Sequence, residues 1–274
     1  MAELPELLVL AQQMDAELAG RRFSEVEVVQ EKCLNLPPTQ FASELVGRSV
    51  ERARNHGKWI FLDLSEGAHL LLNLGMGADT LYYRAGESYD PEHRVRFHFE
   101  DGSGFTCRFW WFGHTHLVTT GELAQHSPTV SLGPLALSPE MDRQRFATLL
   151  DGGRARVKNV LTDQKRISGI GNVYIQDILF RARVHPLLPV AQLDEAGVDR
   201  LYQAMVETLQ LAYDKRGLAY ERDFYGKPGG VTTDDFLVAY REGKPCPVCG
   251  TTIEKIKTGA TASFICPQCQ PAPG

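Results

Sequence analysis

The sequence predicts an α+β protein, in which an N-terminal helix and an antiparallel β domain precede a helical region and a small metal-binding module. Three patterns predict this class: a helical apolar period at the start, alternating apolar residues over much of 23–120, and two cysteine pairs near the end. The chain has 274 residues, roughly two domains' worth, and its 43% hydrophobic content is ordinary for a globular protein.

The first element is expected to be an amphipathic helix over residues 4–20. Pro5 and Glu6 suit its first turn, and Gly20 is a typical residue at a helix end. The apolar residues that repeat at helical spacing are Leu7, Leu10, Ala11, Met14 and Leu18. We expect this stripe to face the core of the protein.

Residues 23–120 alternate between apolar and polar side chains, which is typical of strands with one buried face. Glycines and Asp-Gly pairs separate the runs, so an antiparallel sandwich is expected. The alternating apolar sets are Val26 and Val28; Ile60, Leu62 and Leu64; Val95, Phe97 and Phe99; and Phe105, Cys107 and Phe109. After them we expect a helix at 139–150, helices within 151–216 and a glycine-rich loop at 217–235.

Four of the six cysteines form two C-x2-C pairs, which predict a zinc site. Sixteen residues separate the pair Cys246 and Cys249 from the pair Cys266 and Cys269. Each pair can place two sulfurs on one metal from a tight turn, and four thiolates leave no position for a catalytic water. We therefore expect one structural zinc ion held beside two short strands. Two disulfides are the alternative.

A glycine-rich turn between two expected helices predicts a phosphate-binding site. Gly169 and Gly171 allow a tight turn, and Asn172 can cap the helix that follows. The N–H groups at the start of that helix would face a phosphate, with Lys158 beside them. Residues 151–185 carry seven basic and three acidic side chains, although the whole chain has a net charge of −5. A purely structural helix hairpin is the alternative.

Charge and hydropathy also bear on location and partners. No apolar run reaches the roughly 18 residues that a membrane span needs. The first six residues carry two acids and no base, the opposite of a secretory signal, so we expect a cytosolic protein. An acidic chain with locally basic stretches would bind a polyanion through a limited footprint.

Short motifs along residues 3–269 together resemble the formamidopyrimidine-DNA glycosylase and endonuclease VIII family. They are Glu3-Leu4-Pro5-Glu6, His56-Gly57-Lys58, Leu74-Gly75-Met76, Phe112-Gly113, Leu132-Gly133-Pro134, Gly169-Ile170-Gly171-Asn172, His185-Pro186, Gly226-Lys227-Pro228-Gly229 and the four cysteines. The resemblance implies a β-sandwich domain at 1–135, a helix–two-turn–helix domain at 136–235 and a zinc finger at 236–274. It implies a DNA repair protein of the bacterial cytosol or nucleoid that binds damaged duplex DNA or an abasic site. We expect a monomer that does not associate with membranes.

The resemblance also implies a chemistry in which a damaged base is flipped out of the duplex. The amine of the residue after the initiator methionine attacks the sugar C1′, and strand cleavage by elimination follows from the Schiff base. That residue is Ala2 here, where most bacterial members have proline, and its primary amine can form the imine if Met1 is removed. Glu3 matches the proton-transferring carboxylate, Glu6 a supporting acid, and Lys58 a strand lysine near the lesion phosphate.

The resemblance assigns DNA contacts to a set of residues in three regions. They are Met76, Trp110, Trp111 and Phe112, then Lys158, Gly169, Gly171 and Asn172, and finally Lys227 in the glycine-rich loop. Met76 matches a methionine that fills the void left by the flipped base. Trp110 and Trp111 replace a basic pair of the guanine-oxidation enzymes; they can stack on bases or fill a void, and core packing is the alternative.

One more departure concerns the zinc hairpin. Thr261 stands where many members carry an arginine that grips the lesion phosphate, so this cation is lost unless Lys255 or Lys257 replaces it. Two functions fit the sequence. Glu3, Glu6 and Lys58 favour a DNA glycosylase with AP-lyase activity, whereas Ala2, Thr261 and the tryptophan pair favour a damaged-DNA or DNA-structure binding protein that lost most of that activity. A zinc-ribbon transcription regulator would leave the N-terminal motif unexplained.

Overall fold

The computed structural model describes residues 2–110, 112–150 and 153–273, and it divides into two compact units. Unit 1 comprises Met1–Ser131 and Arg216–Gly230, and unit 2 comprises Leu132–Lys215 and Val231–Gly274. Unit 1 is therefore discontinuous in sequence, because a late segment of the chain belongs with its first half. The bounds of the three domains expected from the sequence stay a prediction.

Helix α1 (Leu4–Leu18) begins unit 1 and confirms the expected N-terminal helix, which ends at Leu18 rather than at Gly20. Glu3 is the N-cap residue, and Glu3 and Glu6 form a reciprocal capping box. All five residues of the expected apolar stripe are buried. The helix packs against two neighbouring strands, β2 (Val50–His56) and β3 (Trp59–Leu64).

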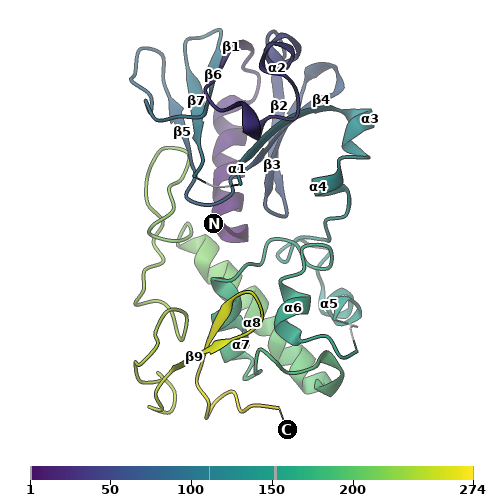
Figure 1. Cartoon of the computed structure of the whole chain (residues 1–274), viewed down its shortest axis with the longest axis vertical. Coiled ribbons are helices and arrows are strands. Elements are labelled where there is room, and N and C mark those ends of the chain that lie inside the picture. The colour runs from purple at the N-terminus through teal and green to yellow at the C-terminus, as the bar shows by residue number, and fades with distance from the viewer. Residues whose placement is uncertain (1, 111, 151–152, 274) are drawn as a thin grey trace. The chain divides into compact units, whose positions relative to one another are not determined.

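Two four-stranded antiparallel sheets complete the core of unit 1. The first has the order β1 (Phe23–Val28), β6 (Val95–Phe99), β7 (Gly104–Arg108) and β5 (Asp79–Tyr83). The second has the order β2, β3, β4 (Ala68–Asn73) and β8 (His114–Thr119). Figure 1 shows α1 and the strands of the two sheets. One cluster of buried side chains draws on α1 and both sheets, which confirms the expected antiparallel sandwich. Of the alternating residues, Phe109 alone lies just past the end of its strand, β7.

Short helices connect or cover these strands in the described part of unit 1. They are η1 (Glu31–Cys33), α2 (Pro38–Leu45), η2 (Ser65–Gly67), α3 (Thr120–Leu123) and α4 (Ser127–Val130). α2 buries Phe41 and Leu45 in the core cluster, so it closes one end of the hydrophobic interior.

Unit 2 is helical, with one hairpin. Its elements are α5 (Arg143–Leu149), α6 (Val157–Leu161), α7 (Tyr174–Arg181), η3 (Val190–Gln192), α8 (Glu195–Asp214), β9 (Glu254–Lys257) and β10 (Ala262–Ile265). α7 packs against both α8 and β10, and β9 pairs with β10 as an antiparallel hairpin between the two cysteine pairs. The helix expected at 139–150 begins at Arg143, because the Asp142 side chain accepts the Arg145 N–H at 2.7 Å and fixes the start.

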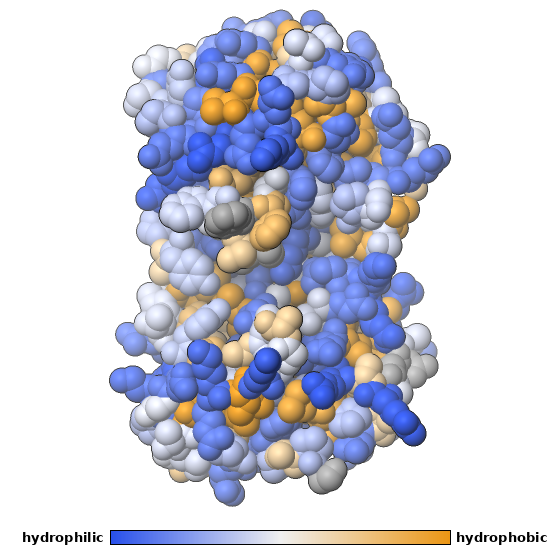
Figure 2. Space-filling model, viewed as in Figure 1, coloured by the Kyte–Doolittle hydropathy of each residue, from blue (hydrophilic) through white to orange (hydrophobic). Residues whose placement is uncertain are grey.

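Within the described residues, none of the helices combines the length and the apolar character that crossing a membrane requires. Hydrophilic side chains cover much of the face shown in Figure 2, and apolar atoms gather there in separate patches.

Candidate functional site

Two of the residues that the sequence assigns to chemistry are buried just before α1 begins. Ala2 is 7% exposed and Glu3 is 2% exposed. The Glu3 N–H donates to Glu6 Oε2 at 2.8 Å, while the Glu3 carboxylate accepts the backbone N–H of Glu6. The second oxygen, Glu6 Oε1, accepts the N–H of Leu218 at 3.0 Å. Glu6 therefore ties the start of α1 to the segment Arg216–Gly230 of the same unit.

Gly217 makes this close approach possible. Its φ is +83°, in the left-handed region that favours glycine. A Cβ at this position would lie 2.7 Å from Glu6 Oε1, closer than real contacts allow. Any other residue at 217 would therefore push the Glu6 carboxylate away from the Leu218 N–H.

Glu221 is an acid that the sequence reasoning named only as part of a loop. Burial, together with the nearby carboxylates of Asp79 and Glu3, raises the pKa of Glu221. A carboxyl group with a raised pKa is a better proton donor near neutral pH. No local periodicity points from this loop to α1, so the acid becomes a candidate only once the fold brings it within electrostatic range of Glu3.

Lys58 lies in the two-residue turn between β2 and β3, so its expected place on a strand is wrong. Gly57 has a φ of +59°, which a tight hairpin turn requires and which glycine adopts without strain. The Lys58 carbonyl accepts a hydrogen bond from Asn73 Nδ2 at 3.1 Å. Asn73, at the end of β4, thus fixes the turn that presents the lysine.

Met76, Trp110 and Phe112 expose large apolar side chains beside the strand ends of unit 1. Their exposed fractions are 49%, 71% and 74%. The Trp110 N–H donates to the Met76 carbonyl at 3.2 Å, which joins the segment after β4 to the segment after β7. Phe112 has a φ of +58°, a strained conformation for a bulky residue. Core packing is therefore wrong for Trp110, and Trp111 lies outside the described residues.

The segment Arg216–Gly230 is fastened to the middle of α1 as well as to its start. Gln13 Nε2 donates to Asp223 Oδ2 at 2.9 Å, and Gln13 Oε1 accepts the N–H of Phe224 at 2.9 Å. Phe224 is fully buried. Burial of the Asp223 carboxyl would by itself raise its pKa, but hydrogen bonds from Gln13 and from the Lys227 backbone lower that pKa below its ordinary value. The Lys227 side chain remains exposed.

In unit 2, the side chain of Gln164 makes hydrogen bonds to the backbone of the turn between α6 and α7. Gly169 has a φ of +102°, and its N–H donates to Gln164 Oε1 at 2.9 Å. Gln164 Nε2 donates to the Ile170 carbonyl at 2.7 Å. Gly171 is buried in the same turn. The turn is therefore held in one shape by Gln164, a residue that the sequence reasoning did not single out.

Asn172 does not cap α7, so that expectation is wrong. The N-cap residue is Val173, which offers no side-chain acceptor. Asn172 Oδ1 instead accepts from Gln176 Nε2 at 3.2 Å, and the same amide reaches the Asn172 carbonyl at 2.9 Å. Asn172 thus lies just before α7, and Gln176 of that helix fixes the orientation of its side chain.

Lys158, which the sequence places beside the phosphate-facing turn, is 3% exposed, so its side chain does not face solvent. Its Nζ lies 2.9–3.0 Å from four oxygens, the hydroxyls of Thr258, Thr261 and Ser263 and the Ala262 carbonyl, so its three N–H groups all have acceptors. Burial lowers the pKa of Lys158 to about 8, which leaves most of it charged near neutral pH. A cation therefore lies under the zinc hairpin at Thr261, the position whose arginine is missing.

The four cysteines of the zinc module have the geometry of a metal site. Their Sγ atoms all lie within 4.8 Å of one another, with separations such as 3.4, 3.6 and 3.9 Å. Zn–S bonds of about 2.3 Å in a tetrahedron require S–S distances of about 3.8 Å. All four cysteines are free thiols, so the disulfide alternative is wrong. Cys246, Cys249, Cys266 and Cys269 form a structural zinc site.

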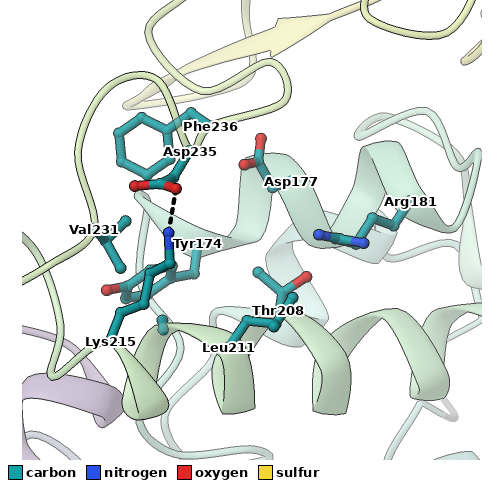
Figure 3. A pocket seen from close by; sticks show the side chains of 10 residues that line it. Tyr174, Asp177, Arg181, Thr208, Leu211, Lys215, Val231, Asp235 and Phe236 are labelled. Atoms are coloured by element: carbon teal, nitrogen blue, oxygen red, sulfur yellow. Dashed lines mark hydrogen bonds and ion pairs between the residues drawn. The ribbon is translucent and has the colours of Figure 1, made fainter.

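A cavity of about 230 Å³ lies in unit 2 between α7, α8 and the chain that leads to the zinc module (Figure 3). Asp177, on α7, accepts the backbone N–H groups of Leu237, Val238 and Ala239 at 2.9, 2.9 and 3.1 Å. Lys215 and Asp235 form an ion pair beside it. Burial raises the pKa of Asp177. Its carboxylate is occupied in anchoring this chain segment.

Comparisons with known proteins agree with this geometry. Three family models match: the formamidopyrimidine-DNA glycosylase N-terminal domain over residues 1–110, its H2TH domain over 132–221, and the zinc finger found in FPG and IleRS over 243–272. The chain is 33% identical to a formamidopyrimidine-DNA glycosylase of Symbiobacterium thermophilum, covering 100% of this chain and 90% of that protein. It is also 33% identical to one of Pelotomaculum thermopropionicum, covering 98% and 99%.

Solved structures agree on the fold. The Lactococcus lactis Fpg in complex with DNA containing an abasic site has a TM-score of 0.89 and 22% identity, over 99% of this chain and 100% of that one. The same bacterium's Fpg with Fapy-dG DNA has a TM-score of 0.88 and 22% identity, over 98% and 100%. From the three family models and the full-length relatives, we conclude that this chain belongs to the formamidopyrimidine-DNA glycosylase family.

Proposed function

We propose that the chain is a DNA glycosylase of base excision repair with AP-lyase activity, acting on damaged duplex DNA or an abasic site. The observation that carries this proposal is the segment just before α1, where Ala2 and Glu3 are buried together and Glu221 lies within electrostatic range of Glu3. The relatives' glycosylase name and the DNA in the Lactococcus lactis structures support it.

In this mechanism Met1 is removed and the Ala2 amine is the nucleophile. An α-amine has an ordinary pKa near 8, so a useful fraction is neutral at physiological pH. The nitrogen attacks the sugar C1′, the bonds from C1′ to the base and to the ring oxygen both break, the base and the ring oxygen each take up a proton, and an imine forms. At an abasic site water leaves C1′ in place of the base. Loss of a C2′ proton then expels the 3′ phosphate. Glu3 carries the protons of both steps, and Glu221 is a second candidate acid.

The remaining site residues position DNA. Lys58 holds the phosphate next to the lesion, Met76 with the aromatic residues Trp110, Trp111 and Phe112 fills the gap in the duplex, and Lys227 adds positive charge. In unit 2, Gly169, Gly171 and Asn172 present the phosphate-facing turn. Lys158 acts through the zinc hairpin, because its ammonium polarises hydroxyls such as that of Thr261 rather than reaching solvent itself.

The second candidate is a lesion-binding protein without most of this chemistry, favoured by Ala2 and by Thr261. Borohydride trapping on abasic DNA separates the two functions. An active enzyme gives a covalent adduct that peptide mapping assigns to Ala2, and intact mass shows that Met1 is absent. Tight binding without an adduct from Met1-free protein, or an adduct on a surface lysine, would leave only the binding function.

The place of action and the oligomeric state complete the proposal. The relatives named above are bacterial proteins, which supports work on the nucleoid in the bacterial cytosol. A monomer is expected, and sedimentation at micromolar concentration tests this directly.

A further inference from the structure

Three histidines and a tryptophan gather in unit 1, and the chemistry proposed above uses none of them. His114 and His116 come from β8, His126 precedes α4, and Trp59 begins β3. Because residues two apart on a strand project from the same face, His114 and His116 point to one side of the sheet. The three imidazoles thus come from two neighbouring parts of the chain.

The rings are close enough to share an ion. His116 Nδ1 lies 2.8 Å from His126 Nε2, and both the His114–His116 and the His116–His126 ring centroids are 5.2 Å apart. The Trp59 ring lies 6.0, 5.6 and 5.5 Å from those of His114, His116 and His126. Trp59 therefore forms an aromatic wall common to all three histidines.

The surrounding hydrogen bonds assign the protons. The Thr129 hydroxyl donates to the His126 carbonyl at 3.4 Å, so its oxygen accepts the N–H of His126 Nδ1 at 2.8 Å. His126 Nε2 then carries a lone pair, and the single proton between the two rings belongs to His116 Nδ1. Burial, followed by the neighbouring imidazoles, lowers the pKa of His116 to about 4, and burial with His114 lowers that of His126. Both rings are neutral at physiological pH.

We propose that His116, His126 and His114 bind a divalent transition-metal ion. The ion takes the place of the proton in the hydrogen bond between His116 Nδ1 and His126 Nε2. Imidazole nitrogens suit Zn²⁺, Ni²⁺ and Cu²⁺, and neutral rings are the ligating form. Two nitrogens at about 2.0–2.1 Å from one ion stand about 3.0–3.3 Å apart, so the pair needs to open by only a few tenths of an ångström. His116 changes tautomer as the ion binds: Nδ1 gives up its proton and Nε2 takes one from solvent, so the ring stays neutral.

The other partners have defined roles. Thr129 holds the second nitrogen of His126, which is how ligating histidines are usually oriented. Among the described residues, only the four cysteines already place three or more ligand atoms within 4.8 Å of one another. His114 must therefore turn its ring to become the third ligand, and water completes the coordination.

Ni²⁺ is the probe for the test, added to DNA-free protein that retains its structural zinc. Equilibrium dialysis with metal analysis should find one Ni²⁺ per chain beside an unchanged single zinc. His116→Ala should weaken Ni²⁺ binding by at least about 10-fold, the scale known even for residues that only support metal ligands. His126→Ala should weaken Ni²⁺ binding to the same extent. If replacing the half-buried His116 impairs folding, the His126→Ala variant provides the test. His98→Ala, on β6 of the other sheet, is the matched histidine control and should bind Ni²⁺ normally.

Fluorescence gives an independent readout. Ni²⁺ should quench the emission of Trp59, and Trp59→Phe should remove that part of the quenching while Ni²⁺ is still bound. Wild-type protein that binds no second metal, or a well-folded His126→Ala variant that binds Ni²⁺ as the wild type does, overturns the proposal. Because no DNA is present, neither result bears on the glycosylase function.

Discussion

In each unit a charged side chain is bonded to a segment far away in sequence, but the two arrangements differ in kind. In unit 1, Glu6 accepts the Leu218 N–H beside two further acids, Glu3 and Glu221. In unit 2, the Lys158 ammonium is surrounded by neutral oxygens of the zinc hairpin. Neighbouring acids can exchange protons with one another, whereas neutral oxygens around an ammonium stabilise its positive charge. In the function proposed above, proton transfer belongs to unit 1, whereas the residues that would contact DNA come from both units.

The largest effect is expected from removing the metal. Cys249→Ser should abolish stoichiometric zinc binding and unfold the hairpin, because structural zinc contributes on the order of 10 kcal/mol in small zinc modules. Lys158 then loses the acceptors that the hairpin supplies, and DNA affinity should fall. Metal analysis and DNA titration of reduced protein measure both losses. Zinc content and affinity equal to wild type would remove the hairpin from the DNA-binding role.

The next largest effect tests the chemical side of the comparison. Glu3→Gln should slow strand cleavage of abasic DNA by about 10²–10⁴-fold, the usual contribution of a positioned acid or base. DNA affinity should change little, because Glu3 is buried and carries no positive charge. Single-turnover cleavage and binding titrations on the same preparations provide the two numbers. Equal losses of rate and affinity would mean that Glu3 supports the fold instead.

The Lys158 cation should show itself in the pH dependence of stability. Burial lowers its pKa from 10.5 to about 8, so the native state binds this proton less tightly than the unfolded chain does. Between about pH 8 and pH 10.5, the unfolded state holds more protons and stability therefore rises with pH. Lys158→Met should remove that rise, as measured by urea unfolding. DNA affinity of the wild type should fall over the same range as the charge is lost, and a flat profile would argue against a buried cation.

The smallest effect is expected at Gln13, which fastens the segment Arg216–Gly230 to α1. Gln13→Ala leaves the buried Phe224 N–H without its acceptor and should cost about 1–2 kcal/mol of stability. Proteolysis after Arg222 should also become faster. The neighbouring variant Gln12→Ala is the control. Equal proteolysis of both variants would show that the Gln13 hydrogen bonds do not hold this segment in place.

Periodicity predicted most of the fold but little of the hydrogen bonding at the site. The apolar stripe of α1, the alternating strands and the cysteine pairs are local patterns, and each was confirmed. The bond from Gln13 to Asp223 and the four close contacts of Lys158 Nζ join residues about a hundred or more positions apart, which no local pattern reports. The sequence places Lys58 on a strand because the residues on both sides of it form strands. The only local sign of the hairpin turn between these strands is Gly57, which has a positive φ. Asn172 was misassigned because its sequence fits a cap that α7 does not use.

The discontinuity of unit 1 has a consequence for how this protein can be divided. A fragment that stops at Ser131 includes every strand of the two sheets but lacks Arg216–Gly230, whose Phe224 ring packs on Tyr82 and Phe105. Such a fragment would expose that apolar surface and leave Glu6 and Gln13 without their partners from the late segment. The first half of the chain is therefore not a transferable module. Gene fusions and domain exchanges must carry the late segment along with the first half of the chain.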